Sequence, residues 1–447
     1  MNISRIEVRG LHGFLSAKIS LKESLAILVG VNGSGKTSIL NLTAHVLKLN
    51  IPELSAVQFS TFKLTGRVGS KSFEIRVARG DCDLDIALKL SGRVVERLVV
   101  RVPTKEELDI DGRSSRFAYD RAMRRVYEQI APSKTAAFLK KNVRLTLVRL
   151  DRSLFAEDSA GGVAVDAPLG SRKGVANEAM DPIDRVRDVT SDRYNKYRIA
   201  FRKHNEELTR QIVLQLFKAP KNLFSSNQAR ARLSSSQIEA LKRKVSKMPY
   251  FGESDEVMSQ VREYFELAIA AIDPQAGDSP SAEHRATRFL FRDFEFPRIN
   301  GLVKAFDQFE ASDNKSRAEL DRLEMLINSF LDESGKEVFF SEKEASLRFR
   351  LKRTSDPSGR AISELSSGEK QIVIVLTYLG FLAGENSIFV VDEPELSLHL
   401  SWQMKLVEAL QSLRPQGSQL VLATHSPEIV GSHRSAVVRV SPDFSAG

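Results

Sequence analysis

A glycine-rich segment, Gly30 to Thr37, restricts the folds open to this chain more than any other feature of its sequence. It reads G-V-N-G-S-G-K-T, with the continuously apolar run Leu25 to Val29 directly before it and a helical pattern up to Lys48 after it. An apolar run of this kind is typical of a strand that is buried on both faces of a parallel sheet. Strand, loop and helix in this order are the setting in which such a loop binds phosphate groups. The sequence therefore predicts an α/β fold with a phosphate-binding loop.

The residue types in this loop suggest individual roles. Gly33 and Gly35 permit backbone angles that side chains forbid, so successive N–H groups can point at phosphate oxygens. Lys36 is expected to reach the outer phosphates of ATP, and the Thr37 hydroxyl is expected to bind Mg²⁺. The candidate nucleotide-binding residues of the loop are Gly30, Asn32, Gly33, Ser34, Gly35, Lys36, Thr37 and Ser38.

Two adjacent carboxylates follow another apolar run, Ile388 to Val391. This run predicts a central strand, and ligands bind at the carboxyl end of such strands in open α/β sheets. We expect Asp392 to hold Mg²⁺, directly or through water. Glu393 is expected to act as a general base on the attacking water, which is typically worth about 10² to 10⁴ in rate.

Three further segments resemble motifs of the ABC-type ATPases. Leu365 to Gln371 (L-S-S-G-E-K-Q) resembles the family's signature motif, and Glu395 to His399 resembles its D-loop. His425, after the apolar run ending at Ala423, resembles its switch histidine. The resemblance implies that His425 contacts the γ-phosphate and acts in catalysis beside Lys36 and Glu393. All the motifs occur in the family's order, and the signature lies over 300 residues after the phosphate loop.

In the family, the signature helix faces the γ-phosphate held by the other protomer. Ser366, Ser367 and Gly368 are at a predicted helix start, where free N–H groups can bind phosphate. The resemblance therefore implies a homodimer, or a higher oligomer, joined head to tail through its ATPase heads. The family's Q-loop glutamine has no clean match here: Asp151 or Arg152, after the strand expected from Val143 to Val148, either replaces it or forms a charged turn.

The remaining segments predict the domain organisation. Alternating patterns from Val57 to Val102 predict an antiparallel meander, and charged helical patterns fill the middle of the chain, the last from Leu302 after Pro297. We expect residues 1–155 and 336–447 to form one ATPase head, 156–182 a flexible loop, and 183–335 a helical insertion. The predicted fold is thus α/β: a P-loop NTPase head of ABC type with an antiparallel β-meander and a helical insertion.

Within the ABC-type ATPases, the chain resembles the branch of RecF, SMC, Rad50 and OLD-type proteins. Its opening, with Leu11-His12-Gly13 ahead of the phosphate loop, resembles that of many bacterial ATPases of this branch. The chain as a whole resembles stand-alone ATPases of anti-phage systems such as Septu and PARIS, which often pair with a nuclease or toxin subunit. No acidic cluster follows His425, so the resemblance implies that such an effector is a separate chain. Cys82 is the only cysteine and no apolar run is long enough to cross a bilayer, so we expect a cytoplasmic protein without a membrane partner.

The middle of the chain is basic, with 13 Lys or Arg against 3 Asp or Glu between Lys196 and Tyr250. The net charge of the whole chain is +9. Helices carrying this charge suit a DNA or RNA backbone, a solvated face, or an acidic protein partner, and the sequence does not separate these.

Three hypotheses follow from the sequence. The first is an ATP-hydrolysing dimer whose closure senses nucleic acid or controls a nuclease or toxin effector in phage defence. The second is a RecF-like DNA repair clamp. The third is a scaffold that assembles with ATP and hydrolyses it little.

Overall fold

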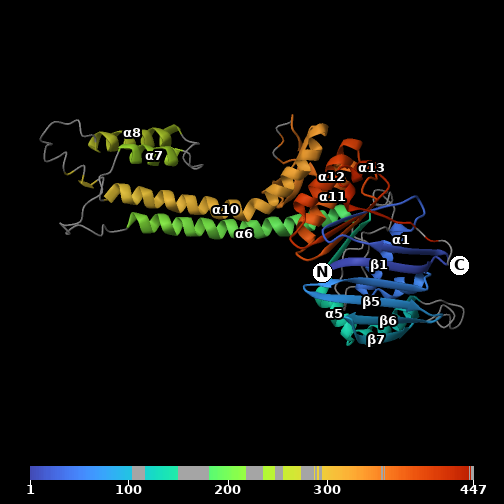
Figure 1. Ribbon diagram of the computed structural model, residues 1–447. Helices are drawn as coiled ribbons and strands as arrows, with labels where there is room; N and C mark the ends of the chain where they lie inside the picture. Colours follow the sequence, from blue (N-terminus) through green and yellow to red (C-terminus); the bar gives the residue numbers. More distant parts are fainter. Residues whose placement is uncertain are drawn as a thin grey trace. The chain divides into compact units, whose positions relative to one another are not determined.

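The structure of this chain is a computed structural model, and its described residues form two compact units (Figure 1). It describes residues 1–102, 116–149, 181–217, 235–246, 255–272, 286, 289–290, 294–353, 356, 358–441 and 443. The first unit combines Met1–Tyr194 with Leu320–Gly447, and the second is Asn195–Glu319. All but the end of the loop expected at 156–182 lies outside the described residues.

A five-stranded parallel sheet is the centre of the first unit. Its strand order is β14-β3-β13-β12-β8. Every residue of β12 and β13 is buried, as expected for apolar strands covered on both faces. The strands are β3 (Leu25–Val29), β8 (Leu145–Arg149), β12 (Ile388–Asp392), β13 (Gln419–Thr424) and β14 (Val437–Arg439).

A six-stranded antiparallel sheet packs against this centre. Alternate residues of its strands face inward, and they join α1 and the parallel strands in one hydrophobic core. Its strands, in spatial order, are β2 (Leu15–Ser20), β1 (Asn2–Leu11), β4 (Thr61–Val68), β5 (Lys71–Arg79), β6 (Asp83–Leu90) and β7 (Arg93–Arg101). The helices of this part are α1 (Lys36–Lys48), α2 (Ile51–Ala56), α4 (Arg116–Ile130) and α5 (Lys134–Asn142).

The chain's last third adds a small sheet and the helices that carry the distal motifs. The segment from Lys336 to Leu351 is a hairpin, because a turn with Ala345 at φ 48° separates two strands. The sheet contains β9 (Lys336–Ser341), β10 (Ser346–Leu351) and β11 (Arg360–Ala361). The helices are α11 (Ser367–Thr377), continued by the π-helical turn η5 (Tyr378–Leu382), α12 (Leu400–Leu413) and α13 (Pro427–Val430), with short 3₁₀ turns η3 (Asp332–Ser334), η4 (Ile362–Glu364) and η6 (Arg434–Ala436).

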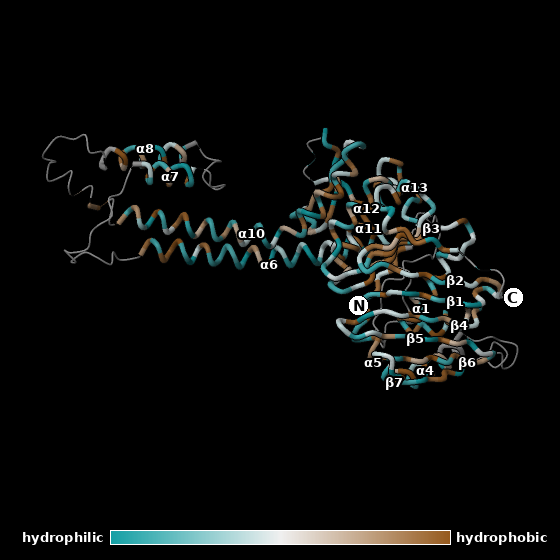
Figure 2. Tube along the Cα trace, viewed as in Figure 1, coloured by the Kyte–Doolittle hydropathy of each residue, from teal (hydrophilic) through white to brown (hydrophobic). Residues whose placement is uncertain are grey.

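The described part of the second unit is helical. Residues on α7 (Ser235–Ser246), α8 (Asp255–Ile272) and α10 (Phe296–Leu331) share a small core around Phe265. Helices α6 (Pro182–Leu216) and α10 each have residues in both units, and hydrophobic and hydrophilic residues alternate along them (Figure 2). Helix α10 begins before the expected Leu302 because Pro297 lies in its first turn, where its missing N–H is not needed. No helix in the described segments is long and apolar enough to cross a membrane.

This arrangement confirms the predicted α/β fold, in which a P-loop NTPase core carries an antiparallel meander and helical additions.

Candidate functional site

The parallel register brings the ends of four distant strands into one row. Val29 of β3 pairs with Thr424 of β13, Ala423 of β13 with Asp392 of β12, and Asp392 with Arg149 of β8. The phosphate loop, the carboxylate pair and the loop containing His425 therefore leave the sheet at the same edge. This is the edge at which open α/β sheets bind ligands.

The phosphate loop has the backbone that its glycines predict. Gly33 and Gly35 have φ angles of 79° and 82°, in the left-handed region that favours glycine. Gly35 precedes α1, and no side chain caps this helix start. The first N–H groups of α1 therefore point out of the helix without an intrahelical partner, next to its positive dipole end. Such an end suits an anion.

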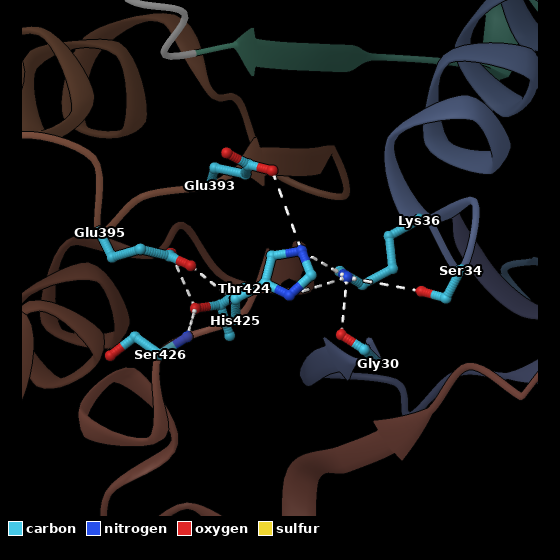
Figure 3. A network of polar contacts seen from close by, with 8 residues as sticks. All are labelled: Gly30, Ser34, Lys36, Glu393, Glu395, Thr424, His425 and Ser426. Carbon is cyan, nitrogen blue, oxygen red and sulfur yellow. Dashed lines mark hydrogen bonds and ion pairs between the residues drawn. The ribbon is translucent and has the colours of Figure 1, made fainter. Parts of the chain in front are cut away.

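Lys36 is the centre of a polar network at the loop (Figure 3). Its ammonium donates to the Gly30 carbonyl at 3.0 Å and lies 2.7 Å from Nε2 of His425. Burial lowers the pKa of Lys36 from its ordinary value. The nearby carboxylates of Glu393, Asp392 and Glu395 oppose this shift in pKa. The ammonium thus belongs to a partly desolvated cluster with negative charge on one side.

The two carboxylates at the end of β12 differ in their surroundings. Asp392 is 5% exposed, whereas Glu393 is half-buried and its Oε1 lies 4.0 Å from Nε2 of His425. The backbone of Glu393 has φ 50°, an uncommon angle for a residue with a side chain, and its N–H donates to the Ala423 carbonyl. Strained backbone of this kind clusters at functional sites. It directs Glu393 away from the strand and toward His425.

Glu395, the first residue of the segment that resembles the D-loop, joins this network, although the sequence assigned it no role. Glu395 accepts the Thr424 hydroxyl at 2.7 Å and the backbone N–H of His425 at 2.6 Å (Figure 3). Ser426 donates its hydroxyl to Gln403 of α12 at 2.7 Å. No local sequence signal identifies these contacts, because they join two loops about 30 residues apart.

The signature segment begins α11, as predicted, and has its own supports. Ser366 and Glu369 form a capping box at the helix start. The buried Glu369 carboxylate also accepts Lys336 of β9 at 2.8 Å. Gly368 packs against the loop after β12, since a Cβ there would lie 2.5 Å from the Ser397 carbonyl oxygen. Ser367 is the first residue of α11.

The other predicted site residues differ in burial, and some of them lie outside the described residues. Asn32 and Thr37 are exposed, and Ser38 contacts Nε2 of His12 at 2.9 Å. Ser34 is buried, and its hydroxyl lies 3.5 Å from the Lys36 ammonium. Among the described residues, no group of three or more His, Cys, Asp or Glu is placed to hold a metal ion. The Q-loop candidates Asp151 and Arg152 are not described, whereas Arg149 ends β8 beside Asp392.

In the second unit, the densest basic segment of the sequence has acidic neighbours. Lys244 of α7 lies 3.2 Å from Asp307 of α10, and Lys242 lies 3.9 Å from Glu266 of α8. Arg202 and Lys203 of α6 are exposed. The sequence count of charges thus overstates the positive charge that α7 presents.

Comparison with known proteins supports the nucleotide-binding fold. Residues 1–430 match the AAA ATPase domain family. The chain is 32% identical over 85 residues to UvrABC system protein A of Helicobacter pylori, covering 19% of this chain and 9% of that protein. The same protein of Aquifex aeolicus is 38% identical over 74 residues, covering 16% and 8%. The chain thus spans less than a tenth of the length of these relatives.

A solved structure of an SMC head bound to the C-winged helix domain of ScpA is similar at 12% identity and a TM-score of 0.36, covering 99% of this chain and 98% of that chain. The family match extends over nearly the whole sequence, and membership supports ATPase activity in general. The chain therefore belongs to the AAA ATPase domain family.

Proposed function

We propose that this chain binds ATP with Mg²⁺ at the phosphate loop and hydrolyses it with Glu393 as general base. One observation carries the proposal: Lys36, His425 and Glu393 meet at the end of the parallel sheet. Nε2 of His425 lies 2.7 Å from the Lys36 ammonium and 4.0 Å from Oε1 of Glu393. A cation, an imidazole and a carboxylate at the mouth of a phosphate loop match the needs of phosphoryl transfer to water.

The residues have distinct roles in this proposal. The Lys36 ammonium exchanges its contacts with Gly30 and His425 for phosphate oxygens. Glu393 accepts a proton from the attacking water, and His425 donates to the γ-phosphate. The Thr37 hydroxyl and the Asp392 carboxylate would hold Mg²⁺, an ion that commonly takes one or two carboxylates and completes its shell with phosphates and water. When bound there, the ion would supply positive charge against the charge that develops on the phosphates.

We further propose that two chains complete each site. Ser366, Ser367 and Gly368 begin α11, and the hydrogen bonds and ion pairs of the described residues tie α11 to β9 and to the loop after β12, not to the phosphate loop. A head-to-tail dimer would set this helix start against ATP held by the other head. ATP then favours the closed pair because it contacts both chains, and hydrolysis removes that preference.

Steady-state ATP turnover tests the assignment. Lys36→Ala is expected to abolish ATP binding, and Glu393→Gln is expected to lower turnover by about 10² to 10⁴ while retaining ATP and accumulating dimer. Lys48→Ala, at the other end of α1, is the matched control and should behave as the wild type. Full turnover in either site variant would refute the proposed roles.

The biological role proposed for ATP-driven closure rests on the resemblance to RecF, SMC, Rad50 and OLD-type proteins. We propose that ATP-driven closure senses nucleic acid or controls a separate nuclease or toxin chain in phage defence. Exposed Arg202 and Lys203 support a nucleic-acid contact on α6. Duplex binding that weakens with salt and falls on neutralising both residues would support it. ATP-dependent duplex binding without an effector favours the RecF-like clamp, and assembly with negligible turnover favours the scaffold.

A further inference from the structure

The Glu395 carboxylate connects two loops that carry proposed catalytic groups. Its Oε2 accepts the Thr424 hydroxyl at 2.7 Å, and its Oε1 accepts the His425 backbone N–H at 2.6 Å. Thr424 is fully buried and ends β13. Both carboxylate oxygens are therefore engaged at the turn from which the His425 imidazole projects toward Lys36.

The loop that presents Glu395 is itself held from several sides. The backbone carbonyl of Glu395 accepts the Leu398 N–H at 3.1 Å, and the Gln403 side chain of α12 donates to the Leu398 carbonyl at 3.0 Å. Gln371 of α11 donates to the carbonyl of Pro394, the residue before Glu395, at 2.8 Å. The carboxylate thus projects from a fixed backbone and imposes a position on the residues that it binds.

We propose that Glu395 is a positioning residue for ATP hydrolysis: it fixes the backbone at His425 so that the imidazole meets Lys36 and Glu393. The inference rests on the proposed function and adds a group to its site. Hydrogen bonds also connect the His425 turn to the signature helix α11, because Gln371 of α11 donates to the carbonyl of Pro394, the residue before Glu395.

Glutamine is the informative replacement because it keeps the size of the side chain. An ionised carboxylate accepts hydrogen bonds at both oxygens, whereas a glutamine amide has one acceptor and one NH₂ group that only donates. In one orientation, Glu395→Gln sets its NH₂ group against the His425 N–H, a donor facing a donor. In the other, the Thr424 hydroxyl accepts from the NH₂ group, and its buried proton loses the acceptor that Glu395 supplied. Either change alters the contacts that hold the turn, and displacements of about 1 Å in a catalytic group can reduce rates about 10²-fold.

A double-mutant cycle with His425→Ala tests whether Glu395 acts through His425. Glu395→Gln alone is expected to lower kcat about ten- to hundredfold with little change in ATP affinity. In the His425→Ala background it should change kcat less than about twofold, because the group that it positions is gone. Equal factors in both backgrounds, or wild-type kcat in Glu395→Gln, would overturn the inference.

Two matched comparisons guard against a general folding defect. Thr424→Val removes one donor to Glu395 and should lower kcat, whereas Thr424→Ser keeps the hydroxyl and should not. Glu428→Gln changes a nearby carboxylate that contacts Ser426 at 2.9 Å and is expected to leave kcat unchanged. Loss of activity in Glu428→Gln equal to that in Glu395→Gln would overturn the specific role.

A spectroscopic readout separates this inference from the proposed function. The chain has 7 histidines, so the ring resonances of His425 can be assigned by their loss in His425→Ala. Glu395→Gln should shift these resonances, and Glu428→Gln should not. Wild-type protein without ATP turnover would refute the proposed function, while unchanged His425 resonances in Glu395→Gln would refute the positioning role.

Discussion

Gly368→Ala tests the contact between the signature helix and the loop after β12. A Cβ at this position would lie 2.5 Å from the Ser397 carbonyl oxygen and 3.8 Å from Cζ3 of Trp402. Carbon contacts are optimal at about 3.5–4.0 Å, so α11 or the Ser397 backbone must move by roughly 1 Å. Ser397 has φ 59° in a tight loop, which leaves little room for it to yield.

The expected cost of this substitution is that of overpacking, about 1–3 kcal/mol. In a unit of this size that corresponds to a fall in melting temperature of roughly 1.5–4.5 °C, measured by calorimetry. Because the moved segment includes the proposed phosphate-binding start of α11, ATP turnover should fall by more than about tenfold.

Gly380→Ala is the matched control. Gly380 lies in η5, the continuation of α11, and the nearest atoms to its added Cβ are leucine methyl carbons at 3.8 Å, which is ordinary contact. This variant should keep the stability and turnover of the wild type. If Gly368→Ala melts and turns over ATP as Gly380→Ala does, the steric reasoning is wrong.

Three further predictions concern charge and backbone strain. Burial would raise the pKa of Glu369, but Lys336 and the Ser366 N–H hold that pKa below its usual value. The carboxylate therefore stabilises the fold at pH values above its ordinary pKa of about 4.3. Glu369→Gln should lower the free energy of unfolding by about 1–3 kcal/mol at neutral pH. Denaturant titrations at several pH values should show this difference vanish on acidification. The pKa of Lys36 is lowered by burial, so just below the ordinary pKa of about 10.4 the unfolded chain binds more protons than the folded chain. The free energy of unfolding of the wild type, taken relative to that of Lys36→Met, should therefore rise from pH 8 to pH 10. An equal difference at the two pH values would contradict this. Glu393 has φ 50°, an angle that glycine adopts at a lower cost than alanine. The free energy of unfolding of Glu393→Gly should therefore exceed that of Glu393→Ala by up to about 1 kcal/mol, although both variants lack turnover. A more stable alanine variant would show that the backbone is not strained.

Much of the fold was predictable because its signals are local. The apolar runs ending at Val29 and Val391 marked buried parallel strands, and alternation from Val57 to Val102 marked the meander. Boundaries were less accurate where a residue has two structural meanings. Pro297 was expected to precede the last helix of the insertion, yet it lies within the first turn of α10.

The candidate site was predictable in its motifs and less so in its contacts. Motif order predicted that Lys36 and His425 share a site, and the structure brings their nitrogen atoms within 2.7 Å across 389 positions of sequence. The order of the motifs did not predict Glu395 as a partner of His425. An acidic residue in a loop has many solvated positions open to it, and only the register of β12 with β13 brings this one under the His425 turn.

The sequence by itself determined the phosphate loop, the buried strands and the order of the motifs, because each depends on residues within a few positions of one another. Only the tertiary structure decided how these segments meet. Parallel pairing aligns Val29, Thr424 and Asp392 in one row, and side-chain contacts such as Lys336 to Glu369 then tie the signature helix to β9. Such contacts depend on the packing of elements far apart in the chain, and no periodicity or spacing along the sequence encodes them.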